Sequence, residues 1–307
     1  MRRLIALLVV LCAGLLGESV FVLHVKTAAL AGDAARARQM VDAYKKAMGQ
    51  TPDYLEGLSW VARGELRAKD YEKAETTAAE VRKLVLARIA KTRLDSNPSY
   101  ATALGASIEV QGLAAAATGR RDQGVGFLRE EAERWKKTSI RARIVKNLNL
   151  LSLEGKPAPP LVTSASLTSR RAQPLASKLG HPVLLFFWAH WCIDCKNEVA
   201  IVAQAQKAYK SRGLEVVAPT QHYGYVEGGQ DASRPIETVY MRAIHKQFYG
   251  ALGDVEVPVS EESFGQYGVS TTPTLVLVDS KGIVRLYNPG AMTYEQLAAK
   301  IEPLVAR

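Results

Sequence analysis

Cysteine and histidine are scarce in this chain of 307 residues, which contains three cysteines and five histidines. Outside the extreme N-terminus the only cysteines are Cys192 and Cys195. A closed structural zinc site usually needs a second pair of cysteine or histidine ligands at matching spacing, and the histidines beyond residue 32 are not paired in that way. The sequence therefore predicts no metal site.

The basic motifs of nucleic-acid-binding proteins are also absent. The formal net charge is +10, but the sequence has no arginine-rich block and no basic stretch interleaved with aromatic residues. A solvated basic surface, of the kind that anionic lipid headgroups attract, explains this charge better. We predict no nucleic-acid partner.

The N-terminus has the pattern of an export signal. Two arginines precede an apolar run over residues 4–16, which is the order of the charged and hydrophobic regions of a signal peptide. A small-residue site at 29–31 favours cleavage, whereas a second apolar run over 19–25 extends the segment to about 22 residues, enough for a membrane span. A cleaved signal and an uncleaved anchor both stay open for residues 1–31. Either one predicts soluble domains outside the cytoplasm, periplasmic or membrane-anchored.

Proline is nearly absent from residues 32–154, where only Pro52 and Pro98 occur. Apolar and small residues recur there at steps of three and four, as in helices with one apolar face. Four breaker segments interrupt the region, which is expected to form about six helices, or three helical hairpins. These breakers lie at 49–53, 68–71, 95–99 and 118–122.

The predicted hairpins resemble tetratricopeptide repeats. Small residues recur at comparable offsets, Ala62 and Ala74 in one hairpin and Gly112 and Gly124 in the next. The spacing departs from the ideal period of ~34 residues, and alanine-rich helix pairs pack alike in an ordinary helical bundle. A repeat-like domain implies a peptide or protein partner, and a plain bundle implies none.

A proline-rich junction, EGKPAPPLV at 154–162, ends the helical region. Three prolines fit an extended linker or a first strand and do not fit a helix. The domain boundary is predicted here, between a helical domain at 32–154 and a second domain at 155–307.

The second domain begins with a strand, a helix and a strand, which is a parallel crossover unit, and ends with two strands and a helix. This order is that of a thioredoxin-like α/β fold, so the predicted fold class is helical hairpin repeats followed by a thioredoxin-like domain. The predicted strands are 181–188, 214–219, 274–279 and 283–287, with helices at 195–213 and 294–305.

The pair Cys192 and Cys195 falls where the first strand of this domain leads into a helix. Free backbone N–H groups and the helix dipole favour an anion at that point, and a Cys192 thiolate is the anion available. Cys195, one helical turn along, is in reach of a mixed disulfide formed at Cys192, so the pair can pass two electrons. A purely structural disulfide is the weaker alternative, because closing a loop of only four residues adds little stability to the fold.

Residues 155–307 resemble the TlpA/ResA branch of thioredoxin-like thiol–disulfide oxidoreductases, which are usually exported and either membrane-tethered or periplasmic. The resemblance implies that Thr272-Pro273 is a cis-proline peptide that faces the disulfide and pairs with the substrate backbone. It also implies a redox-active Cys192–Cys195 disulfide with no other cofactor. The motifs that carry it are GKPAP at 155–159, HPVLLFFWAHWCIDC at 181–195, CKNE at 195–198, YGVSTTPTLVLVD at 267–279 and PGAM at 289–292.

Two positions depart from the family pattern. Ala200 stands where the family often has a proline, which argues against a helix kink there, and Phe186 stands where thioredoxins bury an aspartate that helps to move protons. Glu198 is a candidate to replace that aspartate, although a merely solvated glutamate on the helix surface explains it equally well.

Three neighbours of the cysteines are candidates for tuning or substrate contact. Asp194 disfavours a thiolate at Cys192, whereas His190 favours one only when protonated, and its reference pKa of about 6.5 leaves it mostly neutral at pH 7. Trp191 and Trp188 are expected beside the disulfide, with Trp188 as a core aromatic residue. An insertion at 221–253, rich in His and Tyr, is either a substrate-contacting lid or an ordinary surface loop with a helix.

The function predicted from these features is an exported thiol–disulfide oxidoreductase that reduces protein disulfides. Its partners are a protein disulfide or dithiol, an upstream electron donor borne by the membrane, and a protein partner of the helical domain. The alternative is a helical-repeat adaptor whose thioredoxin-like domain is regulatory or structural.

Overall fold

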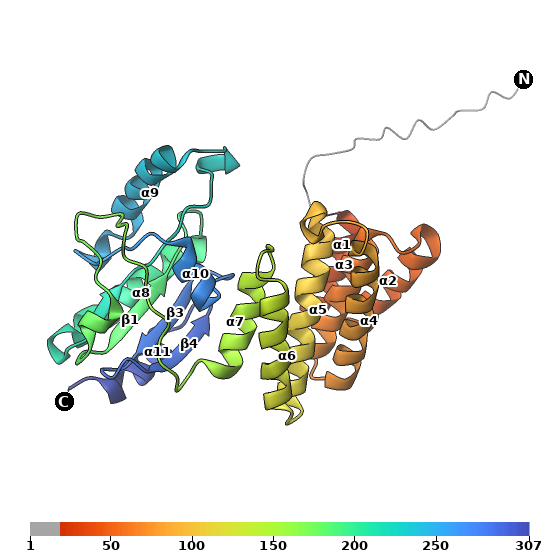
Figure 1. The fold of residues 1–307 in the computed structure, drawn as a ribbon, viewed down its shortest axis with the longest axis horizontal. Coiled ribbons are helices and arrows are strands. Elements are labelled where there is room, and N and C mark those ends of the chain that lie inside the picture. The colour runs from red at the N-terminus through yellow and green to blue at the C-terminus, as the bar shows by residue number, and fades with distance from the viewer. Residues whose placement is uncertain (1–18, 307) are drawn as a thin grey trace, which may run out of the picture.

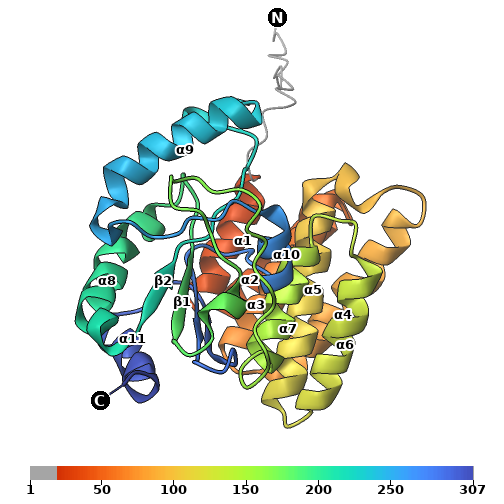
Figure 2. The same ribbon diagram turned by 60° about the vertical axis from the view of Figure 1, so that its left-hand side comes forward.

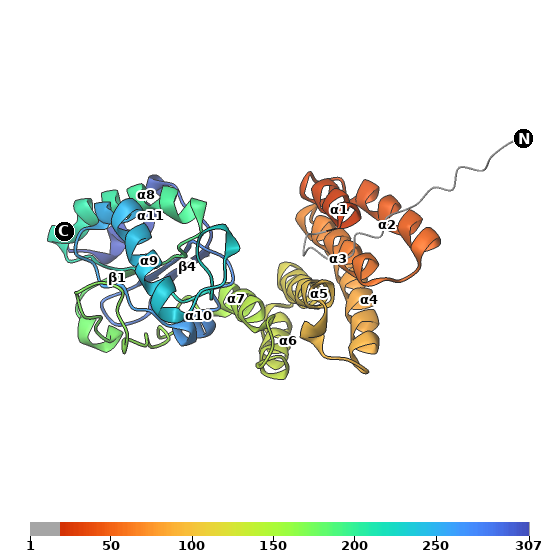
Figure 3. The same ribbon diagram turned by 90° about the horizontal axis from the view of Figure 1, so that it is seen from above.

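The computed structural model describes residues 19–306, and the first part of the predicted export segment, residues 1–18, lies outside the described residues. The chain forms a helical domain followed by an α/β domain, with helix α7 (Arg141–Ser152) between the other helices and the sheet (Figures 1 and 3). No helix within residues 19–306 is long and apolar enough to cross a membrane.

The helical domain confirms the predicted breakers, since each of the four spans the junction between two helices and overlaps the first residues of the second. Pro52 and Pro98 occupy the first positions of their helices, where a missing N–H costs nothing, and the side chains of Thr51 and Asn97 cap those helices. The helices before α7 are α1 Val20–Leu30, α2 Ala34–Met48, α3 Pro52–Arg67, α4 Tyr71–Ile89, α5 Pro98–Ala117 and α6 Arg121–Arg134.

Small residues bring the paired helices close together. Ala62 of α3 and Ala74 of α4 share a fully buried cluster, and a Cβ added at Gly124 of α6 would lie 2.6 Å from the carbonyl oxygen of Gly112 in α5. The small residues at comparable offsets therefore serve helix packing in both hairpins. Their relation to tetratricopeptide repeats stays a prediction, because a plain bundle uses the same contacts.

Helix α1 lies inside the segment predicted as signal or anchor. Val22, Val25, Ala28 and Ala29 are buried, and α1 packs against α3 and α2. The helical core covers the face that carries these four residues, whereas Val20, Leu23 and Leu30 of the same helix stay exposed. Residues 20–30 are therefore part of this domain in the structure.

The α/β domain confirms the predicted order of strands and helices. In the described part of the chain, one mixed sheet has the order β2-β1-β3-β4, with β1 parallel to β2 and antiparallel to β3. Strands β3 and β4 are antiparallel. The strands are β1 Val183–Phe187, β2 Glu215–Val217, β3 Thr274–Val278 and β4 Val284–Pro289.

Side chains alternate between the two faces of the sheet. Leu184 and Phe186 of β1 face the core that α8 and α11 cover, whereas Leu185 and Phe187 face the core that α10 covers. Helix α9 belongs to the insertion at 221–253 and lies along one rim of the domain (Figure 2). The helices are α8 Ile193–Tyr209, α9 Arg234–Phe248, α10 Glu261–Tyr267 and α11 Tyr294–Ile301.

Helix α7 is fastened to the α/β domain although it precedes the proline-rich junction. The Asn149 side-chain amide donates a hydrogen bond of 3.0 Å to the carbonyl of Tyr267, and the Tyr287 N–H donates one of 3.2 Å to the Glu154 carboxylate. Leu153 lies in the core under the sheet. The boundary at residue 155 stays a prediction, and contacts to the sheet domain begin before it.

Candidate active site

The two cysteines are joined in a disulfide at the start of α8. Cys192 is the N-cap residue of that helix, and its sulfur accepts a hydrogen bond of 3.0 Å from the Cys195 N–H. A sulfur thus takes the place that a serine or aspartate oxygen has in an ordinary cap, next to the free N–H groups of the first turn. The position favours negative charge on Cys192 when the disulfide is reduced.

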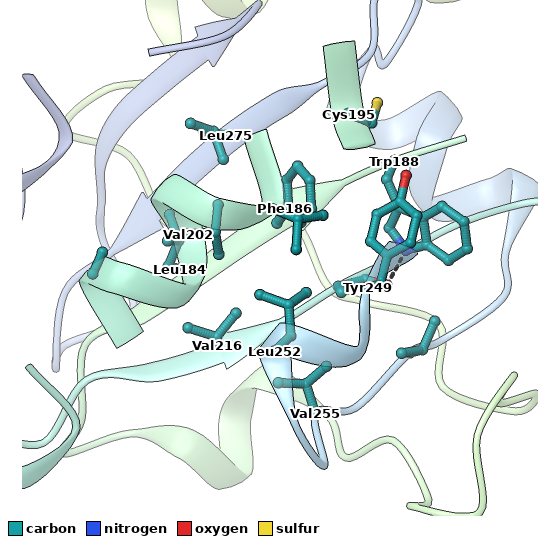
Figure 4. Packing of buried hydrophobic residues seen from close by; sticks show 14 of the residues in the cluster. Leu184, Phe186, Trp188, Cys195, Val202, Val216, Tyr249, Leu252, Val255 and Leu275 are labelled. Atoms are coloured by element: carbon teal, nitrogen blue, oxygen red, sulfur yellow. Dashed lines mark hydrogen bonds between the residues drawn. The ribbon is translucent and has the colours of Figure 1, made fainter. Parts of the chain in front are cut away.

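The neighbouring tryptophans differ in their surroundings. Trp188 is fully buried, donates a hydrogen bond of 3.0 Å to the carbonyl of Ala218 and packs at 4.2 Å between ring centres against Tyr249 (Figure 4). Trp191 is 46% exposed, directly before the redox pair. Trp188 is therefore a core residue, and Trp191 is the tryptophan that a bound substrate can reach.

The Thr272–Pro273 peptide bond is cis. Because Phe187 pairs with Thr274 across β1 and β3, the residue before β3 lies beside the start of the loop that carries the cysteines. The Pro273 carbonyl accepts a hydrogen bond of 2.8 Å from the Gly290 N–H. Substrate positioning by Thr272 and Pro273 stays a prediction.

Glu198 is not a solvated residue of the helix surface. It is only 2% exposed, and its carboxylate accepts a hydrogen bond of 3.1 Å from the Met292 N–H. Burial raises the pKa of the Glu198 carboxyl above its usual value, and the Met292 N–H partly offsets that rise. The solvated alternative is wrong because the loop before α11 closes over this carboxyl, which sequence periodicity does not reveal.

Asp194 differs from Glu198 although both line one cavity of about 590 Å³. Asp194 is exposed in the first turn of α8. The site therefore has one buried and one exposed carboxyl close to the redox pair. Roles in proton transfer or tuning remain predictions for both.

His190 is 1% exposed, and burial lowers its pKa below the usual value, partly offset by Glu237. The insertion at 221–253 surrounds it. Its ring contacts Tyr223, Tyr225 and Tyr240, each at 5.4 Å between ring centres. The aromatic cluster was visible in the sequence, but Glu237 was missed, because nothing local marks a helical glutamate as buried.

Metal ligands are not gathered at this site. Among the described residues, no group of three or more His, Cys, Asp or Glu side chains is arranged to hold a metal ion. The chemistry that the geometry supports is thiol–disulfide exchange by the cysteine pair itself.

A cysteine pair at the start of the helix that follows the first strand of such a sheet defines a thioredoxin-like thiol–disulfide oxidoreductase. Residues 170–304 match the family model of the thioredoxin-like domain. The chain is similar to the thiol-disulfide oxidoreductase ResA of Bacillus subtilis, with 30% identity over 142 residues, 46% of this chain and 69% of that protein.

Two further relatives agree with this match. The thioredoxin-like protein YneN of Bacillus subtilis is 28% identical over 152 residues, 48% of this chain and 79% of its own length. The thiol:disulfide interchange protein DsbE of Xylella fastidiosa is 27% identical over 159 residues, 50% of this chain and 71% of its own length. The chain belongs to the thioredoxin-like thiol–disulfide oxidoreductases of the ResA and DsbE type and is an enzyme of that class.

Proposed function

We propose that this protein is an exported reductant of protein disulfides. The observation that carries the proposal is the Cys192–Cys195 disulfide at the N-terminus of α8, beside an exposed tryptophan. The arginine-led apolar run over residues 4–16 supports export, into the periplasm or onto the membrane.

In the reaction, the reduced pair gives two electrons to the substrate. The Cys192 thiolate attacks one sulfur of a substrate disulfide, forming a mixed disulfide and releasing the first substrate sulfur as a thiolate. The Cys195 thiolate then attacks the Cys192 sulfur, which forms the Cys192–Cys195 disulfide and releases the second substrate sulfur. The released thiolates take up protons according to their own pKa values. A membrane-borne dithiol, oxidised to a disulfide, returns the pair to its reduced state.

The exposed carboxyl of Asp194 supports the proposed direction of electron flow. Asp194 lies in the first turn of α8 and disfavours a thiolate at Cys192, which makes the dithiol form a better donor. We expect a Cys192 pKa nearer ~7 than ~3.5 and a potential nearer ~−270 mV than the ~−120 mV of strong oxidants. A potential above about −170 mV by glutathione equilibration would instead assign an oxidising role.

The helical domain is proposed to recruit or position a partner protein. Its hairpins pack through small residues as repeat domains do, and α7 and the residues directly after it join them to the catalytic domain through the Asn149 and Glu154 hydrogen bonds. A partner bound on the helices would thus be held against the domain that carries the redox pair.

Trapping tests the proposal. In the Cys195→Ser variant the attack at Cys192 is retained and resolution is lost, so disulfide-linked partners should accumulate in extracts of the exported fraction and disappear on adding dithiothreitol. Cys192→Ser is the matched control and should trap nothing. Equal trapping by both variants refutes the assignment of roles, and a wild-type protein that turns over no protein disulfide favours the adaptor alternative.

A further inference from the structure

Glu237 is a fully buried carboxyl in the insertion at 221–253. Its two oxygens accept hydrogen bonds from the backbone N–H groups of Tyr223 and Gly224, at 2.6 and 2.9 Å. It also lies in the first turn of α9, where the helix dipole favours negative charge. The carboxylate therefore holds the loop before α9 against the start of that helix.

The same carboxyl reaches His190. Nε2 of His190 lies 3.3 Å from Glu237 Oε1, without the alignment of a hydrogen bond, and has no other hydrogen-bond partner. The rings of Tyr223 and Tyr240 stand edge-on to the imidazole. A neutral imidazole fits these aromatic surroundings, and the hydrogen bonds to the Glu237 carboxylate come from the two backbone N–H groups.

These contacts fall on the two residues that precede Cys192. The Cys192 N–H donates a hydrogen bond of 3.1 Å to the carbonyl of Ala189, which closes a turn with His190 and Trp191 as its middle residues. His190 contacts Glu237, and Trp191 meets the ring of Tyr223 at 5.6 Å between ring centres. The insertion thus contacts both middle residues of the turn that precedes Cys192, the residue with the attacking sulfur.

We propose that Glu237 is a positioning residue for the redox pair: it fixes the His190-Trp191 turn, and its buried charge keeps the Cys192 couple reducing. Two N–H donors hold the carboxylate in place beside His190, two residues before Cys192, and a fixed negative charge there raises the free energy of a thiolate at Cys192. Because no water reaches Glu237, salt does not screen this effect as it screens the effect of the exposed Asp194. The direction of the shift builds on the proposed function, but the position of the turn does not.

Equilibration with glutathione tests the charge. In Glu237→Gln the equilibrium should shift toward the reduced protein about tenfold, equal to about 30 mV, and should do so at both 0.1 and 1 M NaCl. The shift in Asp194→Asn should have the same direction at low salt and shrink at high salt. Glu227→Gln, an exposed glutamate of the same insertion, should match the wild type. A Glu237→Gln potential equal to wild type, or a shift that vanishes in 1 M salt, overturns the electrostatic part.

Glu237→Asp tests whether these contacts hold the turn in place. The shorter side chain keeps the charge but withdraws the carboxylate from its two N–H donors and from His190. We expect an unchanged potential and a KM for a protein disulfide at least threefold higher, since Trp191 is no longer held. An unchanged KM overturns the proposal, and this variant decides alone if Glu237→Gln does not fold. The glutathione equilibrium can be measured even if the wild type reduces no protein substrate, so failure of the proposed function is seen separately.

Discussion

Substituting Gly268 by alanine tests whether α7 is a fixed part of the α/β domain. Gly268 ends α10 in the left-handed conformation, with φ 64° and ψ 36°. A Cβ added there would lie 2.6 Å from the backbone carbon of Val145 in α7, and its closest neighbour is the backbone nitrogen of Lys146. Backbone atoms cannot rotate away as a side chain can, so α7 or α10 must move.

The expected cost has two parts. An alanine in the left-handed region costs roughly 1–2 kcal/mol, and forcing an extra carbon into a packed interface costs about 1–3 kcal/mol more. Gly228 provides a matched control, because it has φ 69° and ψ 11° and its Cβ would meet nothing within 4 Å. Gly268→Ala should thus lower the free energy of unfolding by about 2–5 kcal/mol, and Gly228→Ala by only about 1–2 kcal/mol.

Urea unfolding of the full chain measures both variants, and limited proteolysis reports where the structure opens. We expect Gly268→Ala to expose cleavage sites around the end of α7 while the cysteine pair still exchanges with glutathione. Equal losses of stability in the two variants would refute the close contact between α7 and α10.

Two other predictions follow from buried groups. The raised pKa of Glu198 means that its folded form holds a proton more tightly than its unfolded form, so the stability it contributes is present at low pH and is lost as pH rises through the folded pKa. Glu198→Gln, which can still accept the Met292 N–H bond, should therefore unfold at higher urea than wild type at pH 7.5, with a smaller gain at pH 4.5; a gain independent of pH would contradict this. In α6, Gly124→Ala should destabilise the chain by about 1–3 kcal/mol, because its Cβ would meet the Gly112 carbonyl. Gly126→Ala, with nothing within 4 Å, should stabilise by up to about 1 kcal/mol, and thermal unfolding of the pair checks the contrast.

The sequence by itself determined most of the helices, the succession of the strands along the chain and the redox pair. Helix limits follow from local chemistry, such as Pro52 and Pro98 at first helical positions behind the caps Thr51 and Asn97. Strands are marked by continuous apolar runs. Two cysteines three positions apart after such a run indicate thiol–disulfide exchange. The break at 135–140 between α6 and α7 was not predicted, because no proline or glycine marks it.

Only the tertiary structure decided which polar residues are buried and what they touch. Glu198 is covered by a loop about 90 residues further along the chain, and Glu237 meets His190 across the insertion. The same holds for α1 and α7, whose helical character is local but whose partners, α3 and α10, are not. Periodicity reports which face of a helix is apolar, whereas the element that covers that face is fixed by how distant parts of the chain pack, and so burial, pKa and the contacts of the redox turn appear only in the folded protein.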